Sequence, residues 1–407
     1  MIRSLFVADI LPRRPAGGAV QRMDVVTGAL AELGPVDALF LTSPDASLPP
    51  EEAARFTRAG LAPVPPYTGA RALLEIAGHG PSAAYARHQR RTLPPVLPDW
   101  ATGTRYDLVW FSRERTWLPL RGRFTGRTVV DVDDFEDVLI RRWERLGRGV
   151  WGVPLTPWQR LQARRSITWW GRVHRRVARE ADLAVVAGAG DAVRMGAGRT
   201  AVVPNTYPAT RPPERPRTGG AVILFQGSFD WAPNADAAEW MVREVLPLVR
   251  ERVPNATVVL AGRSAPEVAA LAGPHVEVTG TVASMTPYLT AADLVVVPLR
   301  VGSGTRVKIL EAFAHGVPVV STTIGAEGLD VVPGEHLAVA DTADGLARHC
   351  ADLLTDRARR DATTAAARRF HLGRHLPEHA AALVRQAARQ AVAGEPVGTA
   401  EGVAAMR

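Results

Sequence analysis

Short apolar runs alternate along the chain with longer segments in which apolar residues recur at helical spacing. In the first half the apolar runs occupy residues 3–8, 36–41, 107–111, 127–132, 182–187 and 200–204. In the second half they occupy residues 221–226, 257–262, 276–280, 293–299, 317–322 and 336–340. Runs of this length, bounded by turn residues, predict strands that are buried on both faces of a parallel sheet. With helices between them, they predict a doubly wound, Rossmann-like α/β fold.

A segment rich in Pro, Arg and Gly separates the two series of strands. It reads TYPATRPPERPRTGG and has no apolar periodicity, which is typical of a linker between domains. The predicted parts are an N-terminal domain over 1–205, a hinge linker over 206–219, a second α/β domain over 220–375, and a C-terminal helix with a flexible tail over 376–407. Ligands of open parallel sheets bind beyond the carboxyl ends of the strands, so two facing sheets would create a cleft between the domains.

The segment over residues 298–322 is the most informative part of the chain. It reads as a strand, a glycine loop at Gly302-Ser303-Gly304, a helix and a further strand. Ser303 or Thr305 can cap the helix, whose free N–H groups form an anion site. Arg306 and Lys308 fall in its first turn, where cations are normally unfavourable. Two cations at this end therefore favour a bound anion with more than one charge.

Glu311 lies one helical turn beyond Lys308, on nearly the same face of that helix,. Its carboxylate could accept hydrogen bonds from sugar hydroxyls next to the bound anion. Alternatively, Glu311 pairs with Lys308 or Arg306 on a solvated helix surface and binds nothing. Both interpretations stay open at this point.

Composition narrows the classes of protein. The chain has 407 residues and a net charge of +8, and Lys308 is the only lysine among 49 Lys and Arg residues. This bias is typical of a GC-rich bacterial genome. The single cysteine, Cys350, excludes a disulfide framework and a thiolate zinc site,. We expect no nucleic-acid partner, because no zinc-finger or RNA-binding signature is present. No uncharged stretch can span a bilayer and Asp9 interrupts the first apolar run, so we expect a cytoplasmic protein.

The motif G-S-G-T-R-x-K-I-L-E-A-F-A-x-G-x-P-V-V-S-T resembles the donor-site signature of retaining GT-B glycosyltransferases of family 4, the glycosyl transferases group 1 domain. Further segments follow in the order of that family, namely FQGSFDWAPNADAAEWM (225–241), ATVVLAGRSAP (256–266) and VEVTGTVASMTPYLTAADLVVVPL (276–299). AGGAVQRM (16–23) resembles the glycine loop of the acceptor domain. The resemblance implies a GT-B fold of two facing Rossmann-like domains. It also implies transfer of a sugar from a nucleoside diphosphate to an acceptor hydroxyl, with retention of configuration.

The resemblance also assigns roles to residues. Glu311 would hold the ribose hydroxyls, and Lys308 with the Gly304–Thr305 backbone would face the diphosphate. The implied catalytic residues are Lys308, Arg306 and Asp133. The implied donor-binding residues are Gly17, Gly18, Gly227, Ser228, Arg263, Val282, Ser303, Gly304, Thr305 and Glu311. Arg263 and Val282 would border the base, whereas Gly17 and Gly18 would close over the diphosphate from the first domain.

Two features depart from the family pattern. Many relatives carry a first glutamate eight residues before the second, but here Ser303 occupies that position. Many relatives also have cations after the first strand of the second domain, whereas the loop 227–234 has none. We expect Arg306 and Lys308 to supply that charge. No resident cofactor or metal is implied, because the nucleoside-diphosphate sugar is a co-substrate.

Several alternatives remain open. The D-x-D of VVDVDDFED (129–137) would suggest a metal site in the single-domain GT-A class, but the duplicated α/β pattern opposes that architecture,. Asp133 or Asp134 would instead orient an acceptor hydroxyl or the donor sugar, or cap a helix. The Arg- and Trp-rich stretch 141–180 either contacts the inner face of an anionic membrane or is an acceptor-domain helix with its tryptophans packed inward, which we favour,.

The acceptor is a small molecule, a glycolipid or a polysaccharide. A sugar phosphorylase or sugar-phosphate synthase of the same fold, and a non-catalytic sugar-nucleotide-binding protein, are the alternative functions.

Overall fold

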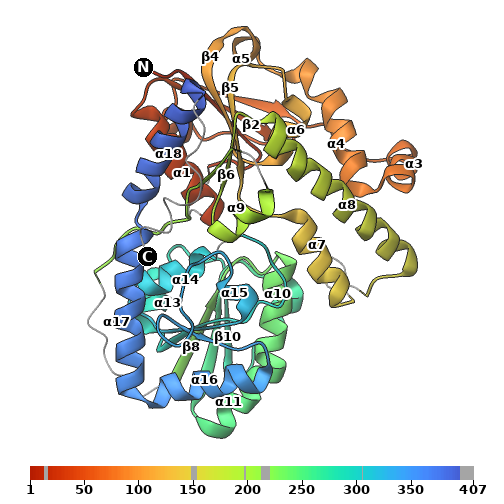
Figure 1. Cartoon of the computed structure of the whole chain (residues 1–407). Helices are drawn as coiled ribbons and strands as arrows, with labels where there is room; N and C mark the ends of the chain where they lie inside the picture. The colour runs from red at the N-terminus through yellow and green to blue at the C-terminus, as the bar shows by residue number, and fades with distance from the viewer. Residues whose placement is uncertain (13–16, 148–153, 197–198, 212–220, 305, 395–407) are drawn as a thin grey trace. The chain divides into compact units, whose positions relative to one another are not determined.

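The computed structural model describes residues 1–12, 17–147, 154–196, 199–211, 221–304 and 306–394 (Figure 1). Thr305, most of the predicted hinge linker and the predicted flexible tail from 395 lie outside the described residues. The chain forms two compact units. The first comprises Met1–Asp137, Trp158–Asn205 and Glu378–Arg407, and the second comprises Val138–Pro157 and Thr206–Pro377. The segment from Val138 to Pro157 thus counts with the second unit, although it precedes residue 205.

The first unit contains a seven-stranded parallel sheet in the order β3-β2-β1-β4-β5-β6-β7. Its strands are β1 (Ser4–Ala8), β2 (Val36–Thr42), β3 (Arg58–Pro63), β4 (Arg105–Phe111), β5 (Thr125–Val132), β6 (Leu183–Val186) and β7 (Thr200–Val202). Every strand that the apolar runs predict is present. β3 was not predicted, because its sequence RAGLAP lies at the sheet edge and is mostly half-buried.

Helices cover both faces of this sheet. They are α1 (Gly18–Ala31), α2 (Pro50–Ala53), α3 (Ala70–His79), α4 (Pro81–Thr92), α5 (Asp99–Gly103), α6 (Glu114–Leu120), α8 (Pro157–Glu180), α9 (Ala189–Met195) and α18 (Pro377–Ala393), with a 3₁₀ turn at Pro94–Val96. Helix α18 comes last in the chain, yet it lies beside α1 (Figure 1). Its buried Val384 and Ala388 share one apolar core with Phe6 of β1 and Val20 of α1.

The second unit contains a six-stranded parallel sheet in the order β10-β9-β8-β11-β12-β13. Its strands are β8 (Ala221–Gln226), β9 (Ala256–Ala261), β10 (Val276–Gly280), β11 (Leu294–Val297), β12 (Val319–Ser321) and β13 (Ala338–Val339). All six lie within the predicted runs or one residue beyond them. The structure therefore has the predicted class, with two doubly wound parallel sheets.

The helices of this unit are α10 (Ala232–Trp240), α11 (Leu246–Arg252), α12 (Pro266–Ala269), α13 (Thr286–Ala291), α14 (Val307–Ala314), α15 (Thr323–Ala326), α16 (Ala343–Thr355) and α17 (Arg357–Arg374). Helix α7 (Glu136–Arg145) belongs to this unit from Val138 onward. Helix α16 packs against α11 (Figure 1). The buried apolar residues of both sheet faces form one continuous core.

Each sheet reverses its strand order once, between β1 and β4 in the first unit and between β8 and β11 in the second. The loops that leave adjacent strands at such a point diverge to opposite faces of the sheet. The crevice that they leave is the usual ligand site of a doubly wound fold.

Candidate functional site

The loop after β8 leaves the sheet at the strand-order reversal of the second unit. Gly227 follows the strand directly, and its N–H donates to the carbonyl oxygen of Ala261 over 2.9 Å. A Cβ atom on Gly227 would lie 2.8 Å from Nδ2 of Asn234 and 3.1 Å from Nζ of Lys308. A side chain here would displace Asn234 or Lys308, so glycine lets these two polar groups approach the backbone closely,.

Lys308 lies at the centre of this group, in the first turn of α14. Its ammonium donates to Oδ1 of Asn234 over 2.9 Å and lies 4.6 Å from the ring centroid of Phe225, which is cation–π geometry. Burial, together with the neighbouring charge of Arg306, lowers the pKa of Lys308 from 10.5 to about 7,. The site therefore holds a cation whose charge is costly until an anion neutralises it.

Asn234 positions this ammonium. It lies in the first turn of α10, and its Nδ2 donates to the carbonyl oxygen of Ser228 over 2.9 Å. Asp236 fixes the same helix to the loop after β11, since it accepts from Nε and Nη2 of Arg300 over 3.0 Å and 2.8 Å. Asn234 thus links the loop after β8 to Lys308 through one side chain.

The glycine loop at 302–304 follows β11, the other strand of this reversal. Gly304 has a φ of 72°, which favours glycine, and helix α14 begins at Val307 with an extended Arg306 as its N-cap,. The expectation that Ser303 caps the helix was wrong, because the helix begins later than the sequence suggests. The Arg306 guanidinium, 6% exposed, donates to the carbonyl oxygens of Ser303 and Gly304. Arg306 therefore braces the loop.

Glu311 lies one turn after Lys308, and polar side chains fix its carboxylate. Oε1 accepts from the Tyr207 hydroxyl over 3.2 Å, and Oε2 lies 3.5 Å from Nε2 of Gln226. Burial raises the pKa of Glu311 above its ordinary value,. Burial and the nearby Glu311 also raise the pKa of Tyr207. Glu311 is therefore an oriented, largely buried hydrogen-bond acceptor and not part of a solvated helix face.

Ser228, Arg263 and Val282 lie at the same carboxyl edge of the sheet. Nη2 of Arg263 donates to Oγ of Ser228 over 3.1 Å and pairs with Asp230 over 2.7 Å. The Arg263 side chain is 66% exposed, so it borders the crevice from solvent. Val282 is half-buried and lies in the loop that follows β10.

A residue outside the predicted site holds the glycine loop from a third side. Arg142 of α7 donates to the carbonyl oxygen of Gly302, and its two terminal nitrogens donate to the Glu327 carboxylate over 2.6 Å and 2.8 Å. Beside it, Trp143 packs in an apolar cluster with Val301. We call Arg142 and Glu327 the loop clamp. Such bidentate pairs fix geometry strongly.

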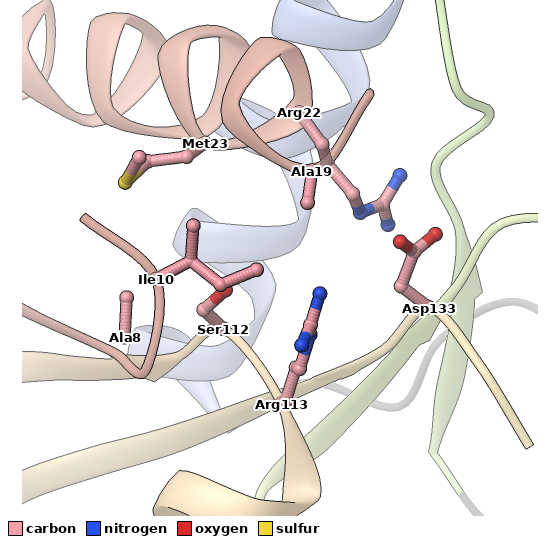
Figure 2. Close-up of a pocket in the computed structure, with 8 residues that line it drawn as sticks. All are labelled: Ala8, Ile10, Ala19, Arg22, Met23, Ser112, Arg113 and Asp133. Atoms are coloured by element: carbon pink, nitrogen blue, oxygen red, sulfur yellow. The ribbon is translucent and has the colours of Figure 1, made fainter. Parts of the chain in front are cut away.

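The first unit has its own polar group at its strand-order reversal. Gly17 caps α1 and Gly18 is its first residue, directly after the loop that leaves β1. Asp133 follows β5, and Nδ2 of Asn205 donates to it over 2.9 Å. Figure 2 shows Asp133 with Arg22 and Arg113 around a small cavity.

The D-x-D pattern of this unit does not form a cluster of free carboxylates. Nε and Nη2 of Arg22 donate to the two oxygens of Asp131 over 2.9 Å and 2.7 Å. Within the part of the chain that the structure describes, no three His, Cys, Asp or Glu side chains are grouped as metal ligands.

Comparison with known proteins finds a family match within the second unit. Residues 220–356 match the sequence model of the family described as glycosyl transferases group 1. The matched residues include Gly227, Lys308 and Glu311. No curated protein matches the chain by sequence.

Solved structures extend the likeness to nearly the whole chain. Sucrose-phosphate synthase from Thermosynechococcus elongatus has a TM-score of 0.71 at 18% identity, over 97% of this chain and 100% of that one. HepE of Anabaena, in complex with UDP, has a TM-score of 0.61 at 15% identity, over 96% and 99%. A variant of TarM from S. aureus, also with UDP, has a TM-score of 0.64 at 9% identity, over 95% and 100%. At these identities the likeness establishes the fold, which is GT-B.

In the matched segment, the structure brings Gly227, Ser228, Lys308 and Glu311 together at one strand-order reversal. Asp133, Gly17 and Gly18 belong to the other unit. Sequence reasoning missed Asn234, Tyr207 and the loop clamp. Asn234 stands within the matched segment, but only its approach to Lys308 reveals its role.

The tryptophans of residues 141–180 divide between interior and surface. Trp143 and Trp170 are buried at 1% and 7% exposure, whereas Trp158 is 53% exposed. Trp151 lies outside the described residues. Among the helices that the structure describes, none combines the length and apolar character needed to cross a membrane.

Proposed function

We propose that the chain is a glycosyltransferase that moves a sugar from a nucleoside-diphosphate sugar to an acceptor hydroxyl, with retention of configuration and without a metal ion. The observation that carries the proposal is Lys308, whose partly buried ammonium is held by Asn234 against the backbone of Gly227. It stands at the start of a helix, where N–H groups also attract anions. A diphosphate supplies the charge that this arrangement lacks.

The proposed chemistry places the ammonium where charge develops. As the bond between the anomeric carbon and the diphosphate oxygen breaks, its electron pair passes to that oxygen. Lys308 and the free N–H groups of α14 stabilise this growing charge more than the ground state. The acceptor oxygen forms the new bond to the anomeric carbon, and its proton passes to the departing diphosphate. Retention follows when the acceptor attacks from the face that the diphosphate leaves.

Glu311 is proposed to bind the ribose of the donor. Its carboxylate is oriented by Tyr207 and Gln226, one turn away from Lys308, so one helix face would hold ribose and diphosphate together. Crystal structures of the similar HepE contain UDP and UDP-glucose, which supports a nucleotide-sugar donor here. Arg306 is proposed to act by holding the glycine loop, and Arg263, Ser228 and Val282 are proposed to line the base subsite.

The test combines binding with turnover. A thermal-shift panel of UDP-, GDP-, ADP- and dTDP-sugars first identifies the donor, because a ligand of the native state raises the melting temperature. Release of the nucleoside diphosphate is then measured for the wild type and for Lys308→Ala. We expect Lys308→Ala to lower turnover by about 10²- to 10³-fold, since one stabilising group at the leaving oxygen is removed.

Arg357→Ala is the matched control, because it removes one cation from a side chain that is 66% exposed on α17. It should retain wild-type turnover. Wild-type turnover in Lys308→Ala would refute the role of the ammonium. Binding of a nucleotide sugar with no release of nucleoside diphosphate would favour a sugar-nucleotide-binding protein. The anomeric configuration of the product, read by NMR, tests retention, and turnover with excess EDTA tests metal independence.

A further inference from the structure

The first unit contains a second and much larger cavity, of about 510 Å³. It lies at the carboxyl ends of β1, β2 and β3, between helices α4, α6 and α8. Ligand sites of small molecules usually have volumes of roughly 300–1,000 Å³. All the residues that line it belong to the first unit, so the cavity is complete within that unit. We call it the aromatic pocket.

Four aromatic side chains line the aromatic pocket, namely Tyr67, Tyr85, Trp169 and Trp170. The planes of the two indoles are inclined by 75°, with centroids 4.7 Å apart, and the two phenol rings are inclined by 59° over 6.0 Å. Neither pair of rings is parallel, so neither pair can sandwich a flat aromatic molecule between its two members. A single aromatic face that is open to the pocket suits the C–H face of a sugar ring.

Side chains fix these rings. Nε1 of Trp170 donates to Oγ of Ser82 over 3.1 Å, and Arg115 lies 5.7 Å from the centre of the same indole. The Tyr67 hydroxyl donates to Glu75 over 3.2 Å. Trp170 is 7% exposed, whereas Trp169 is half-buried. Trp170 and Tyr67 are thus held in place before any ligand binds, which reduces the entropy lost on binding,.

The polar groups of the pocket suit an uncharged, hydroxyl-rich ligand. Asp9, Glu136 and Gln89 provide carboxylate and amide groups among the aromatic rings. Arg115 is the only basic residue among the described residues that line the pocket, and it forms an ion pair with Glu136. Asp9 pairs at 3.6 Å with Arg113. A phosphate bound here would be repelled by the Asp9 carboxylate, and Arg115 is already paired with Glu136. Binding of a phosphate in this pocket is therefore unfavourable.

We propose that the aromatic pocket binds the acceptor as an uncharged pyranose, with a sugar face stacked on Trp169 and sugar hydroxyls donating to Asp9 and Glu136. That the bound sugar is the acceptor rests on the proposed function, whereas the binding of a neutral sugar does not. The chain accordingly glycosylates a neutral saccharide, or the sugar part of a larger molecule, and discriminates against sugar phosphates at this position.

Saturation-transfer NMR on the full chain, without nucleotide, tests the pocket directly. The probes are neutral methyl pyranosides of glucose, mannose, galactose and N-acetylglucosamine with maltose and cellobiose, then glucose 6-phosphate, then the flat 2-naphthol. We expect at least one neutral pyranoside to receive saturation on its ring C–H protons. Trp169→Ala should weaken that binding by about tenfold, the size of one lost stacking contact. Asp9→Asn should weaken it and strengthen binding of glucose 6-phosphate.

Trp158→Ala is the matched control, because it removes an exposed indole of the same helix. It should bind the sugar as the wild type does. The proposal is overturned if no neutral pyranoside binds, if 2-naphthol or glucose 6-phosphate binds more tightly than every neutral sugar, or if Trp169→Ala binds like the wild type.

A turnover measurement separates this proposal from the proposed function. The neutral sugar that binds should accelerate release of nucleoside diphosphate, and Trp169→Ala should raise its KM. If the sugar binds but no nucleoside diphosphate is released, the proposed function fails and the pocket remains a sugar site. If nucleoside diphosphate is released but neutral sugars neither bind nor accelerate it, the pocket proposal fails alone.

Discussion

At the scale of single residues, the burial of Lys308 has a measurable consequence for its protonation. Its ammonium has one amide oxygen, one aromatic ring and a second cation nearby. The free protein therefore disfavours the protonated form, and a pKa of about 7 results. A bound diphosphate supplies two negative charges and should restore the ordinary, higher pKa.

This coupling predicts the pH dependence of donor binding. Because the diphosphate raises the pKa of Lys308, binding takes up a proton above pH 7. The affinity for a nucleotide sugar is then highest below pH 7 and falls as the pH rises towards 9, by up to about tenfold per unit. A diphosphate esterified at both ends has no terminal phosphate to titrate in this range.

Calorimetry in buffers of different ionisation enthalpy measures the proton uptake. Lys308→Ala is the comparison, and its binding should be weaker and independent of pH between 7 and 9. Proton release by the wild type, or an affinity that rises with pH, would contradict the coupling.

The sequence predicts the residues of this site unevenly. Lys308, Glu311 and Gly304 lie within one contiguous motif, where local spacing places them on the same helix turn and its loop. Asn234 and Tyr207 reach the site from segments about 70 and 100 positions away. Such partners depend on tertiary packing, and no local pattern encodes them.

At the scale of elements, the loop clamp makes the glycine loop depend on a helix from the first half of the chain. Arg142 joins α7 to Gly302 and Glu327, and the side chains of the pair are 17% and 33% exposed. The sequence gives no sign of this contact, because α7 and the loop are separated by 160 positions.

Loss of the loop clamp should therefore displace the glycine loop at 302–304. We expect Arg142→Ala to lower kcat/KM for the donor by about 10- to 100-fold, since small displacements of binding groups are costly in rate. Glu327→Gln should have a smaller effect, and the double variant should show strong coupling between the two sites. Arg176→Ala, which breaks an exposed pair with Glu180, is the control and should change little. Additive effects of the two clamp variants would show that the pair does not act as a unit.

The helix after β8 shows where element prediction succeeds and where it fails. Periodicity predicts one helix over 234–250, and the chain is helical from Ala232 to Arg252. Pro247 is followed by five more helical residues, and a π-helical turn at Met241–Val245 precedes it. A π turn accommodates a residue that lacks an N–H group, and apolar spacing alone does not reveal it.

At the scale of the whole molecule, the two units are not two consecutive halves of the sequence. The two series of apolar runs predict two sheets, because each strand is buried on both faces. Which unit takes the last helix depends on a face made mostly of alanines, namely Ala380, Ala387, Ala388 and Ala391 with Val384. Alanine is compatible with many environments, so composition cannot assign this helix.

This packing predicts a remote effect on stability. Val384→Asp places a charge in the core beside β1 and α1, and should destabilise the first unit by at least about 3 kcal/mol. Hydrogen exchange followed by mass spectrometry should show faster exchange in β1 and α1 and unchanged protection in β8 and α14. Arg389→Ala, an exposed position of the same helix, should leave both unaltered. Equal loss of protection in both sheets would show that the units unfold together.

The backbone passes between the two units four times, at residues 137, 157, 205 and 377. Anyone building chimeras with related enzymes to exchange acceptor specificity therefore cannot use a single crossover at residue 205. Such a graft would place a foreign α7 next to the native glycine loop. It would also pack the incoming first sheet against a native α18 that does not match it. A workable exchange keeps residues 138–157 with the second unit and carries α18 along with the first unit.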